Sequence, residues 1–451
     1  MGRLFGTDGI RGIANTELDP TLAFKLGKAS AQLLAEESKK RGTFVIGHDG
    51  RISSDMLCCA LISGICSAGH SVISAGIIPT PAVAYLTKKY SADAGIVVSA
   101  SHNSFEYNGI KIFDKNGSKL SDILEDAIES AISSESSITS QISHGDVGRI
   151  IQKGDPAGEY ASHVKSSSGT LLSGLRIALD CSNGACSHTA EKIFKDLGAE
   201  LHLINASPNG ININDRCGST HLEALSAYVK AHSLDAGAAF DGDGDRCICV
   251  DENGDVFDGD KIMALCASEL LKKGRLTKNT VVGTVMTNLG LIKFFDGLGI
   301  RFIATKVGDK FVSEEMSANS YAFGGEQSGH IIFGEHSSTG DGQLTALQVF
   351  SIMKSRKQKL SDLASIITLC PQYTRNVPIT KSGKQHFSAD KDIERSIKNA
   401  RDKLTGGRII VRPSGTEPLI RIMAEGYDEK EVLSVALSLE KEISEALKKY
   451  E

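Results

Sequence analysis

The segment Asp241–Arg246, which reads DGDGDR, holds the strongest signal for chemistry in this chain. Three carboxylates stand at alternate positions, those of Asp241, Asp243 and Asp245, and the glycines between them allow the backbone to curl. Magnesium prefers about six oxygen ligands, and water or phosphate oxygens complete the set where the protein supplies fewer. Without a cation, carboxylates this close would repel one another strongly. The spacing therefore predicts a site for one Mg²⁺ ion.

The same spacing imitates a calcium-binding EF-hand loop, because Asp stands at its first, third and fifth positions and Glu252 at its twelfth. The sixth position should be glycine but is Arg246, and the ninth is Cys249, a poor oxygen ligand. The flanking runs AGAAF and CICV are typical of strands rather than of helices. We therefore favour a magnesium loop, and a non-catalytic divalent-cation sensor is the alternative outside enzymes.

Ser101 belongs to a second polar loop, in the segment VVSASHNSFEYNGIKIF (97–113). It follows an apolar strand, and Lys111 stands behind an Asn-Gly turn of the same segment. A loop serine is usually a turn residue, because its hydroxyl bonds to nearby backbone groups. Beside a cation loop it has a second interpretation, since phosphorylated Ser101 would supply an oxygen ligand that three aspartates leave open.

Two further loops suit a phosphorylated sugar. In GGEQSGH (324–330), Glu326 and Ser328 suit hydrogen bonds to paired sugar hydroxyls, and His330 suits holding a proton or a charge, although a structural histidine fits equally well. RPSGTEP (412–418) combines hydroxyls, backbone N–H groups and a guanidinium, which suits phosphate. Its candidate ligands are Arg412, Ser414, Gly415 and Thr416, with Arg421 just past the loop. FGTDGIRG (5–12) adds Arg11 in another glycine-flanked loop, which fits either a further anion contact or a plain N-terminal turn.

Short apolar strands alternate with helical patterns along the chain. Strands are predicted at 44–49, 94–98, 175–184, 279–288 and 408–415, and helices open at Asp19-Pro20 and Thr80-Pro81. Alternation of this kind favours mostly parallel, doubly wound sheets. In such sheets ligands bind beyond the carboxyl ends of the strands. Four strands that each run into a polar loop therefore predict four loops around a shared cleft.

The composition describes a large protein with several cores. A chain of 451 residues is expected to form three or four domains. Weak periodicity at 133–148 and turn-rich stretches at 251–260 and 368–373 divide it into 1–152, 153–255, 256–368 and 369–451. We expect a phosphoserine domain, a magnesium-loop domain, a sugar-binding domain and a phosphate-binding C-terminal domain, in that order.

Charge and cysteine usage restrict the class of protein further. The formal charge of −5 disfavours a nucleic-acid partner, and no stretch approaches the ~20 apolar residues of a membrane span. The N-terminal residues do not resemble a signal peptide. The ten cysteines are scattered without metal-ligand spacing, which favours reduced thiols in a cytoplasmic protein.

The four segments SASHN, DGDGDR, GGEQSGH and RPSGTEP, in this order and at these separations, resemble the α-D-phosphohexomutase superfamily. The similarity covers essentially the whole chain. The segments MGRLFGTDGIRG, GTVMTNLGL and KVGDKFV are most similar to bacterial members that act on glucosamine phosphates. The resemblance implies an α/β protein of four domains around a central cleft. The first three would be related mixed sheets flanked by helices, and the fourth a smaller α+β domain.

The resemblance also implies roles for individual residues. Ser101 would carry the phosphate and join Asp241, Asp243 and Asp245 on Mg²⁺. The sugar contacts would be Glu326 and Ser328, and the phosphate site Arg412, Ser414, Gly415, Thr416 and Arg421. Arg11, Lys111, Arg246 and His330 would lie beside the reacting phosphate, with Lys111 or His330 as general acid and base. One departure is visible in the serine loop, where Ser104 stands at a position that is usually proline.

The expected reaction interconverts glucosamine 6-phosphate and glucosamine 1-phosphate and so supplies UDP-N-acetylglucosamine synthesis. Phosphorylated Ser101 and Mg²⁺, one per chain, would be the cofactors, and glucosamine or glucose 1,6-bisphosphate the intermediate or activator. A phosphoglucomutase or phosphomannomutase of the same superfamily is the alternative. We expect a small-molecule phosphosugar as partner, with no nucleic acid and no membrane, and a homodimer is left open.

Overall fold

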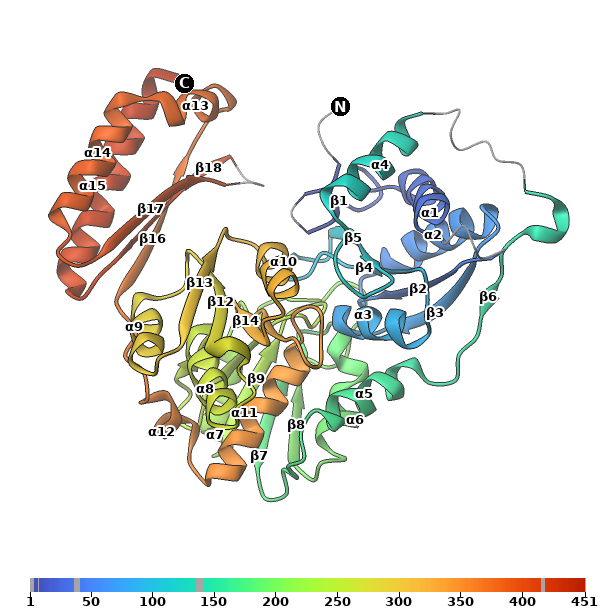
Figure 1. Ribbon diagram of the computed structural model, residues 1–451, viewed down its shortest axis with the longest axis horizontal. Coiled ribbons are helices and arrows are strands. Elements are labelled where there is room, and N and C mark those ends of the chain that lie inside the picture. The colour runs from blue at the N-terminus through green and yellow to red at the C-terminus, as the bar shows by residue number, and fades with distance from the viewer. Residues whose placement is uncertain (1–3, 7, 36–40, 135–141, 415–417, 451) are drawn as a thin grey trace. The chain divides into compact units, whose positions relative to one another are not determined.

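A computed structural model describes residues 4–6, 8–35, 41–134, 142–414 and 418–450 (Figure 1). The chain divides into two compact units. The first comprises Met1–Met286 and Leu298–Ile366, and the second Thr287–Gly297 and Ile367–Glu451.

The first unit contains three sheets that share one arrangement of four strands. In each, the first strand lies between the second and the third and is parallel to both, and the fourth pairs antiparallel with the third. The strands are β2 (Thr43–His48), β3 (Ser71–Ile77), β4 (Ala94–Val98) and β5 (Tyr107–Asp114); β7 (Arg176–Asp180), β8 (Glu200–Ile204), β9 (Ala236–Phe240) and β10 (Cys247–Asp251); and β12 (Thr280–Thr284), β13 (Arg301–Thr305), β14 (Phe323–Gly325) and β15 (Ile331–Phe333). This repetition confirms the prediction of three related mixed sheets.

Short edge strands extend two of these sheets. The first sheet adds β1 (Ile10–Ile13) beside β5 and β6 (Ile150–Ile151) beside β3, which gives it six strands. The second adds β11 (Val256–Phe257) beside β10. Because β6 pairs with β3, the first sheet continues to Ile151.

Helices cover both faces of the first sheet. Phe44 and Ile46 share a buried core with α1, α2 and α4, while a Cβ added at Gly95 would stand 3.0 Å from Val83 of α3. Side chains alternate across a strand, so these contacts lie on opposite faces. The helices of the first unit are α1 (Pro20–Leu34), α2 (Ser54–Ser67), α3 (Thr80–Lys89), α4 (Asp122–Ser133), α5 (Pro156–Ser166), α6 (Ala190–Phe194), α7 (Glu223–Ala231), α8 (Gly259–Lys272), α10 (Asp309–Asn319), α11 (Gly342–Arg356) and α12 (Leu360–Ala364).

The start of α1 illustrates how local sequence sets these elements. The Asp19 side chain accepts a hydrogen bond of 2.7 Å from the Leu22 amide, and Pro20 occupies the first turn. At Gly27, an added Cβ would lie 2.4 Å from the Leu61 carbonyl oxygen of α2. The glycine therefore permits α1 and α2 to pack closely over the sheet.

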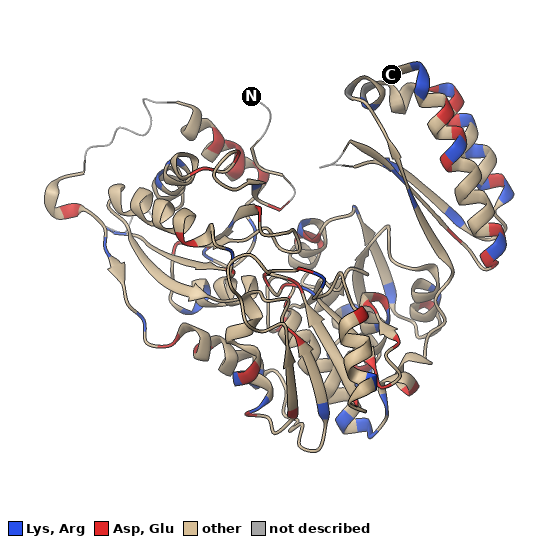
Figure 2. Cartoon of the chain, turned by 180° about the vertical axis from the view of Figure 1, so that it is seen from behind, with Lys and Arg blue, Asp and Glu red and all other residues tan. Residues whose placement is uncertain are grey.

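The second unit is a smaller α+β domain, as predicted. Its sheet is fully antiparallel, with β18 (Leu419–Glu425) between β16 (Gln372–Pro378) and β17 (Arg408–Pro413). Its helices are α9 (Leu289–Gly297), α13 (Lys381–His386), α14 (Lys391–Lys403) and α15 (Glu429–Leu447). Figure 2 shows residues of both charges alternating along the two long C-terminal helices, whose apolar residues join the core under the sheet.

All ten cysteines are free thiols. Burial raises the pKa of the Cys217 thiol to about 12, with smaller contributions from Asp180 and Asp215. Among the described residues, no helix is both long and apolar enough to cross a bilayer.

Candidate active site

Three of the four polar loops occupy the same position in the repeated sheet. Ser101 lies between β4 and β5, the acidic loop Asp241–Arg246 between β9 and β10, and Glu326–His330 between β14 and β15. Each loop follows the third strand and leads into the antiparallel fourth strand. Because ligands bind beyond the carboxyl ends of parallel strands, the fold itself favours these loops as a shared site.

The hydroxyl of Ser101 points at the acidic loop. Ser101 is 1% exposed, and its Oγ donates a hydrogen bond of 2.6 Å to Asp241 Oδ2. The backbone of Ser101 has a φ of +53°, a left-handed conformation that is uncommon for any residue except glycine. Such conformations persist where surrounding contacts hold them, and they cluster at functional sites.

The three aspartates of the acidic loop converge as the sequence predicts. Asp241, Asp243 and Asp245 are at most 3% exposed, and each offers one carboxylate oxygen within 4.8 Å of the others. Strands rather than helices flank the loop, which agrees with the rejection of an EF-hand. The Arg246 amide donates to Asp241 Oδ1 over 3.1 Å, so the loop folds back on its own first residue.

The donor set of this loop fits a hard divalent cation. Within the described part of the chain, Asp243 Oδ1 and Asp245 Oδ1 are buried without a hydrogen-bond partner. Burial, followed by the charges of Asp245 and Asp243, raises the pKa of Asp241 well above its ordinary value. Converging carboxylate oxygens that lack donors are the ligands that Mg²⁺ prefers. These residues therefore form an acidic group that can bind a metal ion.

Lys111 of β5 lies against the same carboxylates. Its Nζ is 2.8 Å from Asp243 Oδ2, 3.2 Å from Asp245 Oδ2 and 2.9 Å from Asp8 Oδ2. Burial acts to lower the pKa of Lys111, but the three carboxylates outweigh it and raise that pKa well above its ordinary value. The ammonium group is therefore within reach of any group that binds at the acidic loop.

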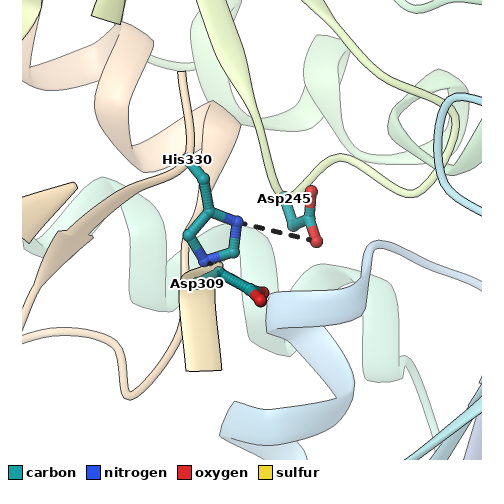
Figure 3. Close-up of side chains that lie close together, drawn as sticks. All are labelled: Asp245, Asp309 and His330. Carbon is teal, nitrogen blue, oxygen red and sulfur yellow. Dashed lines mark ion pairs between the residues drawn. The ribbon is translucent and has the colours of Figure 1, made fainter. Parts of the chain in front are cut away.

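His330 lies between two carboxylates, as Figure 3 shows. Its Nδ1 is 3.7 Å from Asp245 Oδ2 and its Nε2 is 3.6 Å from Asp309 Oδ2. The Gly340 amide donates to Nε2 over 2.9 Å. Burial acts to lower the pKa of His330, but Asp309 and Asp245 outweigh it and raise the pKa. The third loop thus brings an imidazole to the acidic loop of the second sheet.

Three further charged residues, Asp8, Lys119 and Asp309, join these ion pairs, although the sequence alone predicts no role for them. Lys119 Nζ is 2.5 Å from Asp8 Oδ1 and also pairs with Asp309, which in turn faces His330. Asp8 and Asp309 lie in the segments FGTDGIRG and KVGDKFV, and the resemblance of these segments to the superfamily implies no role for either carboxylate. Lys119 lies beyond β5, outside every predicted loop, and only the tertiary fold brings it to its partners.

The remaining predicted residues of the first unit surround this centre. Arg11 Nη1 donates to Asn103 Oδ1 of the serine loop over 3.2 Å, and Arg246 Nε is 3.8 Å from Asp245 Oδ1. Glu326 Oε1 accepts from the Gly308 amide over 3.2 Å. Burial, followed by the charge of Asp309, raises the pKa of Glu326. Ser328 is exposed in the same loop as His330.

The phosphate candidates lie in the second unit. Arg412 and Arg421 are direct cross-strand partners on β17 and β18. Residues directly opposite each other share one face of a sheet, so both guanidinium-bearing side chains lie on the same face. The carbonyl of Ser414, a buried residue, accepts from Lys384 Nζ over 2.8 Å, which adds a cation that sequence reasoning missed. Gly415 and Thr416 lie outside the described residues.

Family models match nearly the whole chain. They are described as phosphoglucomutase/phosphomannomutase, alpha/beta/alpha domains I, II and III, at residues 2–139, 158–254 and 258–369, and as the C-terminal domain of the same family, at 375–442. The chain therefore belongs to the phosphoglucomutase/phosphomannomutase family, the α-D-phosphohexomutases, which are isomerases. The family and the four-domain fold expected from the sequence are confirmed.

Curated relatives narrow the comparison within that family. The chain is 51% identical over 446 residues to the phosphoglucosamine mutase of Clostridium novyi, covering 99% of both chains. It is 49% identical over 448 residues to the phosphoglucosamine mutase of Acetivibrio thermocellus, covering 99% of this chain and 100% of the relative.

Solved structures agree on the fold. A phosphoglucomutase/phosphomannomutase family protein from Burkholderia thailandensis superposes with a TM-score of 0.83 at 23% identity, covering 98% of this chain and 97% of that one. The N-acetylphosphoglucosamine mutase of Aspergillus fumigatus, solved with GlcNAc-6P and magnesium, gives 0.68 at 18% identity, covering 98% and 96%.

Proposed function

We propose that this chain is a phosphoglucosamine mutase, which interconverts glucosamine 6-phosphate and glucosamine 1-phosphate through phosphorylated Ser101. The observation that carries the proposal is the buried Ser101 hydroxyl, 2.6 Å from the first carboxylate of a three-aspartate loop. Full-length relatives that are 51% and 49% identical and are named phosphoglucosamine mutase support the amino-sugar substrate.

The reaction proceeds in two phosphoryl transfers, one from Ser101 to the sugar and one from the sugar back to Ser101. In the first, the free sugar hydroxyl attacks phosphorus, the bond from phosphorus to Ser101 Oγ breaks, and the hydroxyl proton passes to a base. The product is the 1,6-bisphosphate. In the second, Ser101 Oγ attacks the other phosphate, and the departing sugar oxygen receives a proton. The net change is the position of one phosphate, so no other reactant is consumed.

Lys111 and His330 are the candidates for moving these protons. Both are buried beside Asp245, at 3.2 and 3.7 Å from its Oδ2. Neither is preferred over the other, because each contacts the acidic loop with one nitrogen. Arg11 and Arg246 supply further positive charge for the reacting phosphate, which carries spread negative charge in its transition state.

Asp241, Asp243, Asp245 and an oxygen of phosphorylated Ser101 would hold Mg²⁺, one per chain. When bound, the ion neutralises charge on the transferring phosphoryl group. Buried carboxylate oxygens without hydrogen-bond donors support this assignment.

The substrate is held at both ends in this proposal. Glu326 and Ser328 bind sugar hydroxyls, and the remote phosphate is bound by Arg412, Ser414, Gly415, Thr416 and Arg421. The facing pair Arg412 and Arg421 supports the phosphate assignment, because two guanidiniums on one face suit a dianion. A fixed remote anchor is needed because both ends of the sugar must react with one serine.

The alternative substrates are glucose and mannose phosphates. Glu326 and Ser328 contact hydroxyls that all three sugars share, so this loop does not select the 2-amino group. We expect the purified chain to convert glucosamine 6-phosphate at least about tenfold faster, in kcat/KM, than glucose or mannose 6-phosphate, a discrimination of about 1.4 kcal/mol. A coupled assay for each 1-phosphate product measures this ratio. A higher kcat/KM for glucose or mannose phosphate would contradict the amino-sugar assignment.

The remaining proposals concern context. We propose domain boundaries at 1–152, 153–255, 256–368 and 369–451. Glucosamine or glucose 1,6-bisphosphate serves as the intermediate or activator, and the product supplies UDP-N-acetylglucosamine synthesis in the cytoplasm. Ten free cysteines support a reducing compartment. A homodimer is tested by the mass of the protein in solution.

A further inference from the structure

Arg51, between β2 and α2, uses four of the five donors of its guanidinium to hold the backbone around Ser101. An arginine side chain has five N–H donors in a fixed planar fork. Nε donates to Asp49 Oδ2 over 2.8 Å. The other four contacts are to backbone carbonyls: Nη1 to Ser104 and to Tyr107 at 2.9 Å, and Nη2 to Ser101 at 3.0 Å and Asn103 at 2.8 Å. One buried side chain therefore fixes four carbonyls of the serine loop.

Asp49 also holds the backbone amide of Ser101, through the hydroxyl of Ser99. Its Oδ2 accepts from the Ser99 hydroxyl, and Ser99 Oγ accepts in turn from the Ser101 N–H over 3.0 Å. Asp49 Oδ1 accepts from Ser54 Oγ over 3.1 Å, which ties the carboxylate to the start of α2. Both the N–H and the C=O of Ser101 are thus held through one buried ion pair, in which Asp49 is 1% exposed and Arg51 2%.

The second sheet supplies a matching contact from the opposite side. Asn214 Nδ2 donates to the carbonyls of Ser101 and Asn103, each over 2.9 Å. Gly242, inside the acidic loop, approaches so closely that an added Cβ would lie 2.5 Å from the Ser101 carbonyl oxygen. The Ser101 backbone is therefore enclosed by groups from both sheets.

This enclosure accounts for an unfavourable backbone conformation. A serine with φ of +53° is held in a left-handed backbone conformation that residues with a side chain disfavour. Hydrogen bonds from Arg51 and Asn214 to the Ser101 carbonyl supply the restraint.

We propose that Arg51, supported by Asp49 and Ser99, is the positioning residue that keeps the Ser101 hydroxyl directed at the acidic loop. It touches neither sugar nor reacting phosphorus and acts only through the Ser101 backbone. The inference rests on the proposed mutase function. It makes the rate of phosphoryl transfer to and from Ser101 depend on a guanidinium one loop away.

The test is the variant Arg51→Lys, with Ser99→Ala as a second variant that removes only one relay hydroxyl. Lysine keeps the charge beside Asp49 but offers three donors from a single nitrogen, so it cannot span four carbonyls and a carboxylate. We expect kcat to fall about 100-fold, as a misplacement of about 1 Å can produce, with KM within about threefold. We also expect slower phosphorylation of Ser101 by glucose 1,6-bisphosphate, followed by intact mass. Ser99→Ala should show the same pattern with a smaller loss.

The matched control is Arg356→Lys. Arg356, at the end of α11, makes a half-buried ion pair of 2.6 Å with Glu269 of α8 and has no contact with the serine loop. The variant Arg356→Lys should lower the melting temperature of the protein without changing kcat. If Arg51→Lys does not fold, kcat and Ser101 phosphorylation in Ser99→Ala test the positioning role.

Unchanged kcat and unchanged phosphorylation of Ser101 in the folded variants would overturn the positioning role. A wild-type protein that carries no phosphate on Ser101 and has no mutase activity would instead overturn the proposed function. The two failures are therefore distinguished by the wild-type measurement alone.

Discussion

The charges around Ser101 alternate in sign from one residue to the next. Lys111 lies between Asp8 and the acidic loop, Lys119 between Asp8 and Asp309, and His330 between Asp309 and Asp245. Buried charges of this kind are tolerated only when each is paired, and removal of one partner leaves the other uncompensated. The network therefore links segments of the first and third sheets in two ways, directly through Lys119 and Asp309 and also through the acidic loop of the second sheet.

Replacement of Ser101 by alanine should abolish mutase activity and leave the fold intact, because the hydroxyl is needed as the phosphate carrier. Intact-mass analysis should find one phosphate on a fraction of the wild-type protein, in the peptide around Ser101, and none on Ser101→Ala. Circular dichroism checks the fold. Retention of full activity would exclude Ser101 as the nucleophile.

Loss of one carboxylate should weaken magnesium binding at the acidic loop. Asp243→Asn removes a buried ligand charge, and we expect the affinity for Mg²⁺, measured by calorimetry, to fall at least about tenfold. Asp255→Asn, an exposed residue outside the loop, is the control and should bind as the wild type does. Preferential calcium binding with a large conformational change would favour the non-catalytic sensor.

Removal of the Lys119 ammonium group should destabilise the fold, because it would leave the carboxylates of Asp8 and Asp309 without this partner. Lys119 is only 12% exposed, so Lys119→Met is expected to reduce the free energy of unfolding by about 3 kcal/mol. Adding Asp309→Asn should recover part of this loss, because one uncompensated charge is then gone. Strictly additive effects in the double variant would contradict the coupling.

At the scale of elements, the sequence predicted the strands and the loops that follow them. The helix start at Asp19-Pro20, the strand at 94–98 and the three aspartates all follow from local pattern. Asp8, Lys119 and Asp309 could not be selected in the same way, because single charged residues are common and only tertiary pairing distinguishes them. The contacts of Arg51 with the serine loop also depend on backbone groups distant in sequence, and Ser99 supports them by accepting from the Ser101 N–H.

The start of α14 should show a defined acid sensitivity. Burial acts to raise the pKa of Asp390, but hydrogen bonds from Lys449, Tyr450 and backbone amides lower that pKa to about 2. The folded pKa lies below the unfolded value of about 3.9, so the unfolded state takes up the proton first. The contribution to stability is therefore complete above about pH 4 and is lost as the pH falls toward about 2.

Asp390→Asn isolates this effect, because asparagine still caps the helix but cannot pair with Lys449. Near neutral pH the variant should be less stable by about 1 kcal/mol, since the partner ammonium is partly exposed. Thermal unfolding followed by circular dichroism should show the difference shrinking as the pH is lowered from about 4 to about 2. A difference that grows on acidification would have the wrong sign for this account.

At the scale of the whole molecule, the residues of the candidate site belong to two compact units. The first holds Ser101, Lys111, the acidic loop and His330, and the second holds Arg412, Ser414 and Arg421. Under the proposed function, phosphoryl transfer and recognition of the remote phosphate are therefore tasks of different units. Variants in the second unit should change the affinity for substrate without changing the fraction of protein that is phosphorylated on Ser101.

Arg421→Gln is the variant that tests this division. We expect KM for glucosamine 6-phosphate to rise about tenfold, because one charge-assisted contact to phosphate is lost, with Ser101 phosphorylation unchanged. Arg395→Gln, an exposed residue of α14, serves as the control. Unchanged KM in Arg421→Gln would contradict the assignment of Arg421 to the phosphate site.

The central claim, that Ser101 carries the phosphate between two positions of one sugar, is tested most directly by single-turnover transfer. Enzyme labelled with radioactive phosphate on Ser101 is mixed with excess glucosamine 6-phosphate and Mg²⁺, quenched at short times and separated into protein and sugar fractions. We expect the label to leave Ser101 and to appear first in the 1,6-bisphosphate, at a rate no slower than kcat. Label that stays on the protein while glucosamine 1-phosphate forms would contradict it.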